Sequence, residues 1–449
     1  MGTLPNWCWM HYEQYMTREW LQCKKEGRMV DDLKSFCEFI EENYGKRDVK
    51  KLGEAMGELL TSAPIDPAFK YVEPSLYEEI LKESEAHSFK KVNVNEISNL
   101  KDHLAGAWIG RIAGCLLGKP LEGWRTDRLY PLLKQSNNYP LNRYLSTKDF
   151  TKEMIDELFI DVNGWWIDNV KEASFADDDT TYTVLGMKMV EYFGKEFTAN
   201  DALETWMRFL PIVTTCTAER YTYRNAAKGL LPPQTAIYQN PYREYIGAQI
   251  RADFFGYVNV GDPLSAAKMA FKDASISHLK NGIYGEMWVA AMIAIACVEK
   301  DPVKIISEAL KQVPTNSRLN EHVMEIVNHY LSKMSEEEDR EFLHQKYNEC
   351  IELEWGYVLT NASVVAHGIL YGEGDFAKSI CYAVQCGFDT DCNGATVGSV
   401  VGMMVGESKI NPYWYNSFHK KLLTSVDGYN LVSVEQLVEK TIELINKTN

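Results

Sequence analysis

The sequence predicts an all-α fold, in which one large compact helical bundle follows an N-terminal helical extension. Glycines recur at four-residue intervals in two separate segments, which places them along one face of a helix. Apolar residues recur at helical spacing through most of the chain after residue 100, whereas the alternation typical of strands is scarce. The chain has 449 residues, 45% hydrophobic and 24% charged, which suffices for one large core with an added segment.

The first 98 residues differ from the rest of the chain. They are rich in charge, and residues 7–25, 30–42 and 74–88 have the amphipathic pattern of helices. The segment SAPIDP, residues 62–67, interrupts this pattern with two prolines. No chemical motif occurs here, so we expect residues 1–98 to form an extension of unknown function that pads the core, covers a site or dimerises. Residues 99–449 are expected to form the main domain.

Two glycine-rich helices are expected inside the main domain. A glycine in a helix costs about 1 kcal/mol relative to alanine, so repeated glycines need a packing or functional reason. We expect their bare faces to let another backbone approach closely. The glycines concerned are Gly106, Gly110, Gly114 and Gly118 in residues 102–121, and Gly398, Gly402 and Gly406 near the C-terminus. Further helices are predicted over residues 362–370, 376–385 and 396–405, a solvated charged helix over 333–353, and a loop over 229–247.

Composition excludes several classes of function. The net charge is −16 and no long run of Lys or Arg occurs, which disfavours a nucleic-acid or anionic-membrane surface. The ten cysteines form no CxxC pair, so neither a zinc ribbon nor a disulfide scaffold is indicated. The longest apolar run, residues 287–298, is too short to span a bilayer, and the N-terminus has no secretion signal. We therefore expect a cytoplasmic protein, whose oligomeric state the sequence leaves open.

Two acidic clusters adjoin strongly apolar sequence. The first is Asp177, Asp178 and Asp179, and the second contains Asp389 and Asp391. Carboxylates gathered at the mouth of a helical core favour a hard divalent cation such as Mg²⁺ or Mn²⁺. Aspartate at a helix start also caps free N–H groups, which offers a second interpretation of each cluster. On spacing alone the two interpretations are equally supported.

Other catalytic motifs are absent or incomplete. Residues 114–120, GCLLGKP, resemble a phosphate-binding loop but are one residue short between the glycines and have proline where Ser or Thr is required. The sequence contains no GxGxxG, HExxH or GxSxG motif.

Three motifs in order resemble the ADP-ribosylglycohydrolase family, which includes dinitrogen-reductase-activating glycohydrolases and ADP-ribosylarginine hydrolases. They are GAWIGRIAGCLLGKPLE at residues 106–122, DDDT at 177–180 and GFDTDCNGAT at 387–396. The resemblance covers about residues 99–425 and leaves residues 1–98 outside it. It implies an all-α fold, a binuclear Mg²⁺ or Mn²⁺ centre, and cleavage of the bond between C1″ of ADP-ribose and an acceptor.

The resemblance also implies a set of metal ligands. Asp178 and Asp179 match the acidic pair of the first family motif, while Asp177 replaces a ligating threonine and keeps an oxygen ligand. Asp389 and Asp391 match the ligands of the second motif, with Asp391 bridging the two ions. Cys392 stands at the second ligating threonine, and a thiol is a poor ligand for magnesium. The second ion is therefore expected to be weaker, bound as manganese, or completed by Asn393 or water.

Roles in catalysis and substrate binding follow from the same resemblance. Glu122 matches a glutamate that several family members place near the scissile bond, so Glu122 or a cluster carboxylate such as Asp179 is expected to act as acid or base. A metal-activated water would attack a carbon with oxocarbenium character. Glycine-rich helix starts, an aromatic ring and an arginine are the candidates for holding diphosphate and adenine. The substrate-binding candidates are Gly118, Arg251, Tyr284, Asn393 and Gly394.

Three functions remain open at this point. The first is metal-dependent hydrolysis of an ADP-ribosyl bond on a protein or small molecule. The second keeps the metals and the ribose but has another N- or O-ribosyl substrate, such as a nucleoside-like molecule. The third is a non-catalytic ADP-ribose-binding or structural protein, which the retained carboxylates disfavour because buried uncompensated charge is costly.

Overall fold

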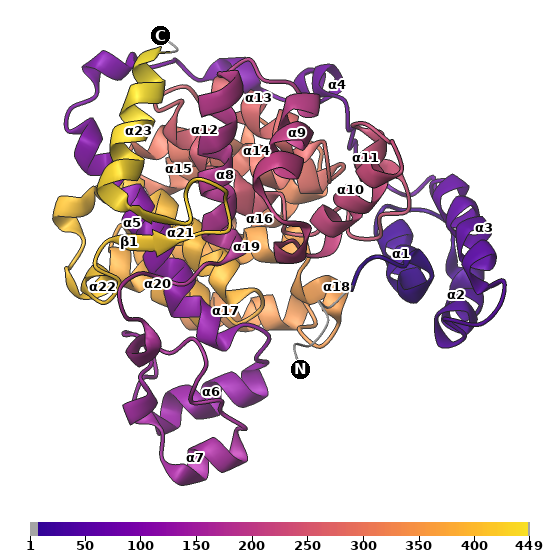
Figure 1. The fold of residues 1–449 in the computed structure, drawn as a ribbon, viewed down its shortest axis with the longest axis horizontal. Coiled ribbons are helices and arrows are strands. Elements are labelled where there is room, and N and C mark those ends of the chain that lie inside the picture. The colour runs from indigo at the N-terminus through magenta and orange to yellow at the C-terminus, as the bar shows by residue number, and fades with distance from the viewer. Residues whose placement is uncertain (1–7, 448–449) are drawn as a thin grey trace.

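The computed structural model describes residues 8–447 and confirms the all-α class (Figure 1). Within these residues the only sheet is one antiparallel pair, β1 (Lys421–Leu423) and β2 (Leu431–Ser433). The helices of the first 98 residues are α1 (Met16–Lys25), α2 (Lys34–Glu42), α3 (Val49–Ser62) and α4 (Tyr77–Lys82). Those of the next part are α5 (Leu100–Gly118), α6 (Thr126–Gln135), α7 (Lys152–Glu157), α8 (Asp178–Phe193), α9 (Ala199–Phe209), α10 (Thr217–Ala227), α11 (Gln234–Ile237) and α12 (Asp253–Tyr257). The remaining helices are α13 (Pro263–Ala274), α14 (Asn281–Ala296), α15 (Pro302–Leu310), α16 (Arg318–Leu331), α17 (Glu336–Lys346), α18 (Glu352–Trp355), α19 (Val358–Gly372), α20 (Phe376–Gln385), α21 (Thr390–Val405), α22 (Tyr413–Asn416) and α23 (Val434–Lys447).

Helices α5 and α21 pack against each other at the centre of the main domain, through their glycines. The contacts pair Gly106 with Gly402, Gly110 with Gly398 and Gly114 with Gly394, so the helices are antiparallel and in register every four residues. A Cβ added to Gly394 would lie 2.5 Å from the carbonyl oxygen of Gly114. Only glycine therefore permits this approach, which confirms the predicted role of the repeated glycines.

The core around this pair is mostly apolar. Every residue of α14 is buried, in agreement with the apolar run that starts at residue 287, and α14 also contacts α21. Helices α19 and α20 also pack on α21. A helix that is apolar all round is stable only when it is enclosed, which places α14 inside the domain.

The segment before α8 is held in place by the small sheet. The backbone N–H of Ser174 donates to the carbonyl of Lys421 at 2.9 Å, and the N–H of Leu423 donates to the carbonyl of Ser174 at 3.1 Å. Asp177 then begins α8 as its N-cap, because its carboxylate accepts the N–H of Asp179 at 3.0 Å. The capping interpretation of the first cluster is thus correct for Asp177.

The charged segment over residues 333–353 is only partly solvated. It forms the shorter helix α17, in which Asp339, Arg340 and Leu343 are buried. Both oxygens of Asp339 contact imidazoles, His329 at 2.6 Å and His367 at 2.6 Å. The prediction of a solvated helix is therefore wrong for one face of α17, because that face is buried and carries an ion-pair network.

The first 98 residues pack against the main domain in two different ways. Helices α1–α3 form a lobe at one side of the molecule, and the chain after α3 runs back over the core (Figure 1). Along this path the N–H of Val72 donates to Asn316 at 2.9 Å, and the N–H of Val92 donates to Gly261 at 3.0 Å. The purpose of this extension, and its boundary at residue 98, stay predictions.

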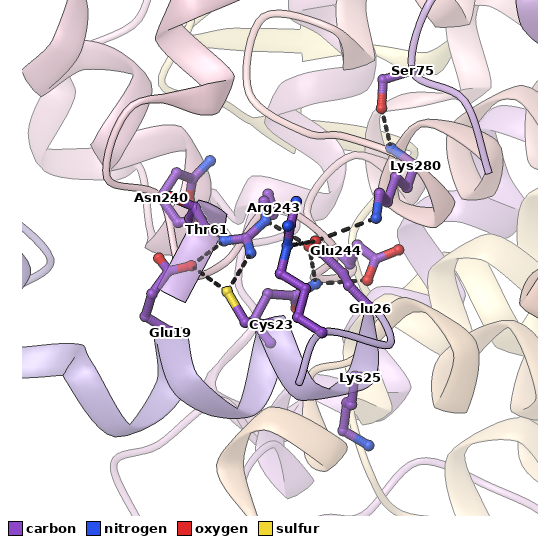
Figure 2. Close-up of polar contacts among 12 residues, drawn as sticks. Glu19, Cys23, Lys25, Glu26, Thr61, Ser75, Asn240, Arg243, Glu244 and Lys280 are labelled. Atoms are coloured by element: carbon purple, nitrogen blue, oxygen red, sulfur yellow. Dashed lines mark hydrogen bonds and ion pairs between the residues drawn. The ribbon is translucent and has the colours of Figure 1, made fainter. Parts of the chain in front are cut away.

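Buried ion pairs attach the α1–α3 lobe to the main domain (Figure 2). Arg243 donates to Glu19 and to Glu26 of the extension, both at 2.6 Å, and contacts the thiol of Cys23. Lys280 adds a longer contact to Glu26 at 3.3 Å. Because Glu19, Glu26 and Arg243 are all buried, each charge depends on its partner for the interactions it lost on leaving water.

Substituting Gly110 with alanine tests the contact between α5 and α21. The added Cβ would overlap the carbonyl of Gly398, and backbone on both sides cannot move aside. We expect Gly110→Ala to lower the free energy of unfolding by at least about 3 kcal/mol, measured by urea unfolding followed by circular dichroism. The control is Gly45→Ala, which meets no atom within 4 Å and costs only about 1 kcal/mol for its left-handed backbone. Equal losses in the two variants would contradict the packing argument.

Substituting Arg243 with methionine tests the attachment of the extension. The variant leaves Glu19 buried without its cation and Glu26 with only the longer contacts to Lys280 and Arg28, so we expect a loss of about 3–5 kcal/mol. Arg208→Met is the matched control, since Arg208 and Glu204 form an exposed pair worth at most about 1 kcal/mol. Limited proteolysis should also cut the Arg243→Met variant within the extension first. A loss no larger than that of the control would refute the anchoring role.

Candidate active site

Three segments far apart in sequence meet at one end of the α5–α21 pair. The glycine register sets Gly118, the last residue of α5, against Thr390 at the start of α21, and the Thr390 hydroxyl donates to the Gly118 carbonyl at 2.9 Å. The chain continues from Gly118 to Glu122, while Asp389 and Asp391 flank Thr390. The start of α8 supplies the third segment. Both acidic clusters and Glu122 therefore belong to one site.

Lys119 lies among these carboxylates. Its ammonium nitrogen is 2.6 Å from Glu122 Oε2, 2.7 Å from Asp177 Oδ2 and 2.9 Å from Asp391 Oδ2. The side chain is 18% exposed, so the contacts are largely shielded from water. No role for Lys119 was predicted from the sequence. Its position three residues before Glu122, in the segment resembling a phosphate loop, is the only signal that could have indicated one.

Several carboxylate oxygens converge without partners. Among the described residues, three groups place ligand atoms within 4.8 Å of one another. Glu122, Asp389 and Asp391 form one; Asp179, Asp391 and Cys392 form the second; Cys115, Asp177 and Asp179 form the third. One oxygen each of Asp179, Asp389 and Asp391 is buried and has no hydrogen-bond partner. Hard oxygen donors left unsatisfied in this way fit Mg²⁺ or Mn²⁺.

Arg111 fixes the position of Asp179. Its guanidinium donates to Asp179 Oδ1 and to the Asp179 carbonyl, both at 2.8 Å, and to the Thr396 hydroxyl at 3.0 Å. It also pairs with Asp253 at 3.2 Å, and all three charged side chains are fully buried. Arg111 thus joins α5, α8 and α21 behind the cluster. Arg111 was not among the residues predicted from the sequence, although an arginine inside an apolar glycine-rich helix indicates a buried partner.

The electrostatics of the cluster oppose full ionisation in the absence of a bound cation. Burial raises the pKa of Asp178, Asp179 and Asp389 well above the usual carboxyl range, and neighbouring carboxylates raise it further. Burial and Asp391 likewise raise the pKa of Glu122 to about 7, although its side chain is 39% exposed and solvent screens part of the effect. Burial also opposes the ionisation of Asp177, but Lys119 outweighs it and the pKa of Asp177 is lowered.

The predicted metal ligands differ in their surroundings. Asp179, Asp389 and Asp391 are buried, and each contributes to at least one of the three groups. Asp177 both caps α8 and contacts Lys119. Asp178 is part of none of the three groups. Cys392 lies near Asp179 and Asp391, and burial raises the pKa of its thiol, which keeps it neutral.

Asn393 is positioned by a residue that the sequence analysis did not single out. Its amide nitrogen donates to Asn361 Oδ1 at 2.8 Å, and its own oxygen has no partner. The same Asn361 oxygen accepts the N–H of Asp389 at 3.4 Å. Asn361 of α19 therefore orients both ends of this turn, and Asn393 stays a candidate for contact with an ion or a substrate.

The other substrate-binding candidates have contacts elsewhere. Gly118 and Gly394 are used in the contact between α5 and α21, which leaves no open backbone at either glycine. Arg251 is buried among Glu219 at 2.7 Å, Asp273 at 2.5 Å and Glu286 at 3.4 Å. The Tyr284 hydroxyl donates to the carbonyl of Pro74 in the extension. The geometry thus explains these four residues by packing and buried ion pairs, and their role in substrate binding stays a prediction.

Comparison with known proteins identifies the family. A sequence model described as ADP-ribosylglycohydrolase matches residues 96–447, which is most of the chain. A solved structure described as an ADP-ribosylglycohydrolase-related protein complex aligns with 78% of this chain and 99% of its own, at 16% identity and a TM-score of 0.48. No curated protein matches. No helix within residues 8–447 is both long and apolar enough to cross a membrane. On the match over residues 96–447, the chain belongs to the ADP-ribosylglycohydrolase family and is a glycohydrolase of that type.

Proposed function

We propose that the protein is a metal-dependent hydrolase that cleaves the glycosidic bond between ADP-ribose and an acceptor, on a protein or a small molecule. The observation that carries this proposal is the convergence of Asp179, Asp389 and Asp391, each with one buried and unpartnered oxygen, in a chain of this family. A structural or binding protein would gain nothing from these unsatisfied carboxylates. A site that holds a cation needs them.

The ligands of a divalent ion can be named from the donor set. Glu122, Asp389 and Asp391 supply three carboxylates and form the group that contains no thiol. When bound, Mg²⁺ or Mn²⁺ would lower the pKa of a water molecule and orient hydroxyl groups of a ribose. The number of ions depends on Lys119, because its ammonium group already contacts three of the carboxylates.

Glu122 is the residue best placed to move a proton at the scissile bond. Its side chain is 39% exposed, whereas those of Asp177 and Asp391 are 6% and 2% exposed, so a substrate reaches Glu122 first. The contact at 2.6 Å with Lys119 orients the carboxylate. A carboxyl group there can protonate the leaving acceptor or take a proton from the attacking water. Asp179 is held by Arg111 on its other side, which suits a fixed negative charge near a carbon with oxocarbenium character.

Removal of the metal or of Asp391 tests the proposal directly. We expect release of free ADP-ribose from ADP-ribosylated arginine or serine peptides with Mg²⁺ or Mn²⁺, and none with EDTA. Asp391→Asn should lower turnover on the order of 10³-fold, because a lost ligand removes several kcal/mol of transition-state stabilisation. Asp427→Asn, an exposed aspartate outside the site, is the control. Metal-dependent cleavage of a nucleoside-like substrate alone would favour hydrolysis of another N- or O-ribosyl bond. Cleavage of neither substrate would refute the proposal that the protein is a hydrolase.

Substituting Glu122 with glutamine tests its role in proton transfer. We expect kcat to fall roughly 10²–10⁴-fold. The midpoint of urea unfolding should stay the same or rise, because burial and repulsion by Asp391, which oppose the charge of this carboxylate, outweigh the attraction of Lys119. Glu172→Gln, at an exposed position, should leave both quantities unchanged. Full activity of Glu122→Gln would exclude Glu122 as the acid or base.

A further inference from the structure

The ammonium group of Lys119 occupies the space in which carboxylates from three segments face one another. Its contacts reach Glu122 next to α5, Asp177 before α8 and Asp391 in α21, all between 2.6 and 2.9 Å. A cation at hydrogen-bond distance from three carboxylates does what a metal ion does there, since it neutralises charge and satisfies oxygen lone pairs.

We propose that Lys119 is a built-in cation that takes one of the two metal positions, so that the protein binds a single divalent ion. The ammonium joins Asp177 to Asp391, and the ion is held beside it by Glu122, Asp389 and Asp391. This inference rests on the proposed function only in assuming that the cluster binds a metal.

The backbone around Lys119 keeps its side chain in the cluster. Gly118, directly before Lys119, is held against Thr390 by the close approach of α5 and α21, and Pro120 directly follows Lys119. The Lys119 side chain is only 18% exposed. Moving it out would leave Asp177 and Asp391, at 6% and 2% exposure, without their cation.

The oxygens that Lys119 leaves free define the place of the single ion. Lys119 contacts Asp391 through Oδ2, whereas Asp391 Oδ1 is buried without a partner. Asp389 Oδ1 is also without a partner, and Glu122 completes this group within 4.8 Å. Asp391 thus has one oxygen for the ammonium and one for the ion.

A second divalent ion would find poor ligands in the remaining groups. Each of the other two groups contains a thiol, Cys115 in one and Cys392 in the other. Thiols are soft ligands that suit neither Mg²⁺ nor Mn²⁺. Asp179, which belongs to both groups, already has one oxygen bound to Arg111, and Asp177 is bound to Lys119. While Lys119 holds one oxygen each of Asp177 and Asp391, the second metal position therefore lacks the hard ligands that would outweigh the thiols, and removal of the ammonium group would free them.

Metal stoichiometry tests this inference without reference to activity. The protein is loaded with Mn²⁺ and dialysed, and its metal content is measured by mass spectrometry with electron paramagnetic resonance of the bound ion. We expect one Mn²⁺ per wild-type chain and the signal of an isolated ion. Two ions per wild-type chain with a spin-coupled signal, or no bound ion, would overturn the inference.

Variants separate the roles of the residues. Lys119→Met removes the charge at similar size, and we expect the content to rise from one Mn²⁺ to two, whereas Lys119→Arg should keep one. Lys188→Met is the matched control, because Lys188 pairs with Glu191 outside the cluster. Asp389→Asn should abolish binding, while Asp177→Asn should retain one ion. If Lys119→Met binds one ion, the lysine does not occupy a metal position. If this variant does not fold, the number of Mn²⁺ ions bound by the wild type and by the two aspartate variants tests the inference.

The outcome is separable from that of the proposed function. One ion per chain without release of ADP-ribose would refute the proposed activity and leave the role of Lys119 intact. Metal-dependent release with two bound ions would do the reverse.

Discussion

The close approach of α5 and α21 is the contact on which the site depends. Each glycine of one helix meets backbone of the other, so the two helices fit only in one register. A slip of one turn would move Gly118 by about 5–6 Å along α21. Lys119 and Glu122, one and four residues after Gly118, would then no longer reach Asp391. The same contact that fills the core therefore also brings the carboxylates of two distant motifs together.

Two cations make the gathering of carboxylates possible. Arg111 is fully buried behind the cluster and binds Asp179, and Lys119 lies at its mouth and binds Asp177 and Asp391. Buried carboxylates without such partners would be protonated or would destabilise the fold. The two cations still leave several oxygens unpaired, and this remainder is the physical basis for a bound metal ion. Structural and catalytic demands thus act on the same side chains.

Buried ion pairs also join the first 98 residues to the main domain. Arg243 and Arg318 of the main domain are buried against carboxylates that the first 98 residues supply, among them Glu26 and Glu73. Arg318 also binds Glu244 of the main domain at 2.8 Å. Because a buried charge depends on its partners, the extension cannot leave without exposing these arginines or removing carboxylates that they bind. It is therefore an integral part of the packed structure, whatever further role it has.

The sequence by itself determined the helical class, the close-packing role of the repeated glycines and the carboxylates of the two motifs, because periodicity and local motifs depend only on residues that are close together in the chain. The use of Asp177 as an N-cap followed from the same local chemistry. Only the tertiary structure decided which charges meet. Lys119 and Arg111 contact aspartates 58 to 272 residues away, and Arg251 is engaged in core ion pairs. Such pairings depend on helix register and burial, which no single segment of sequence contains.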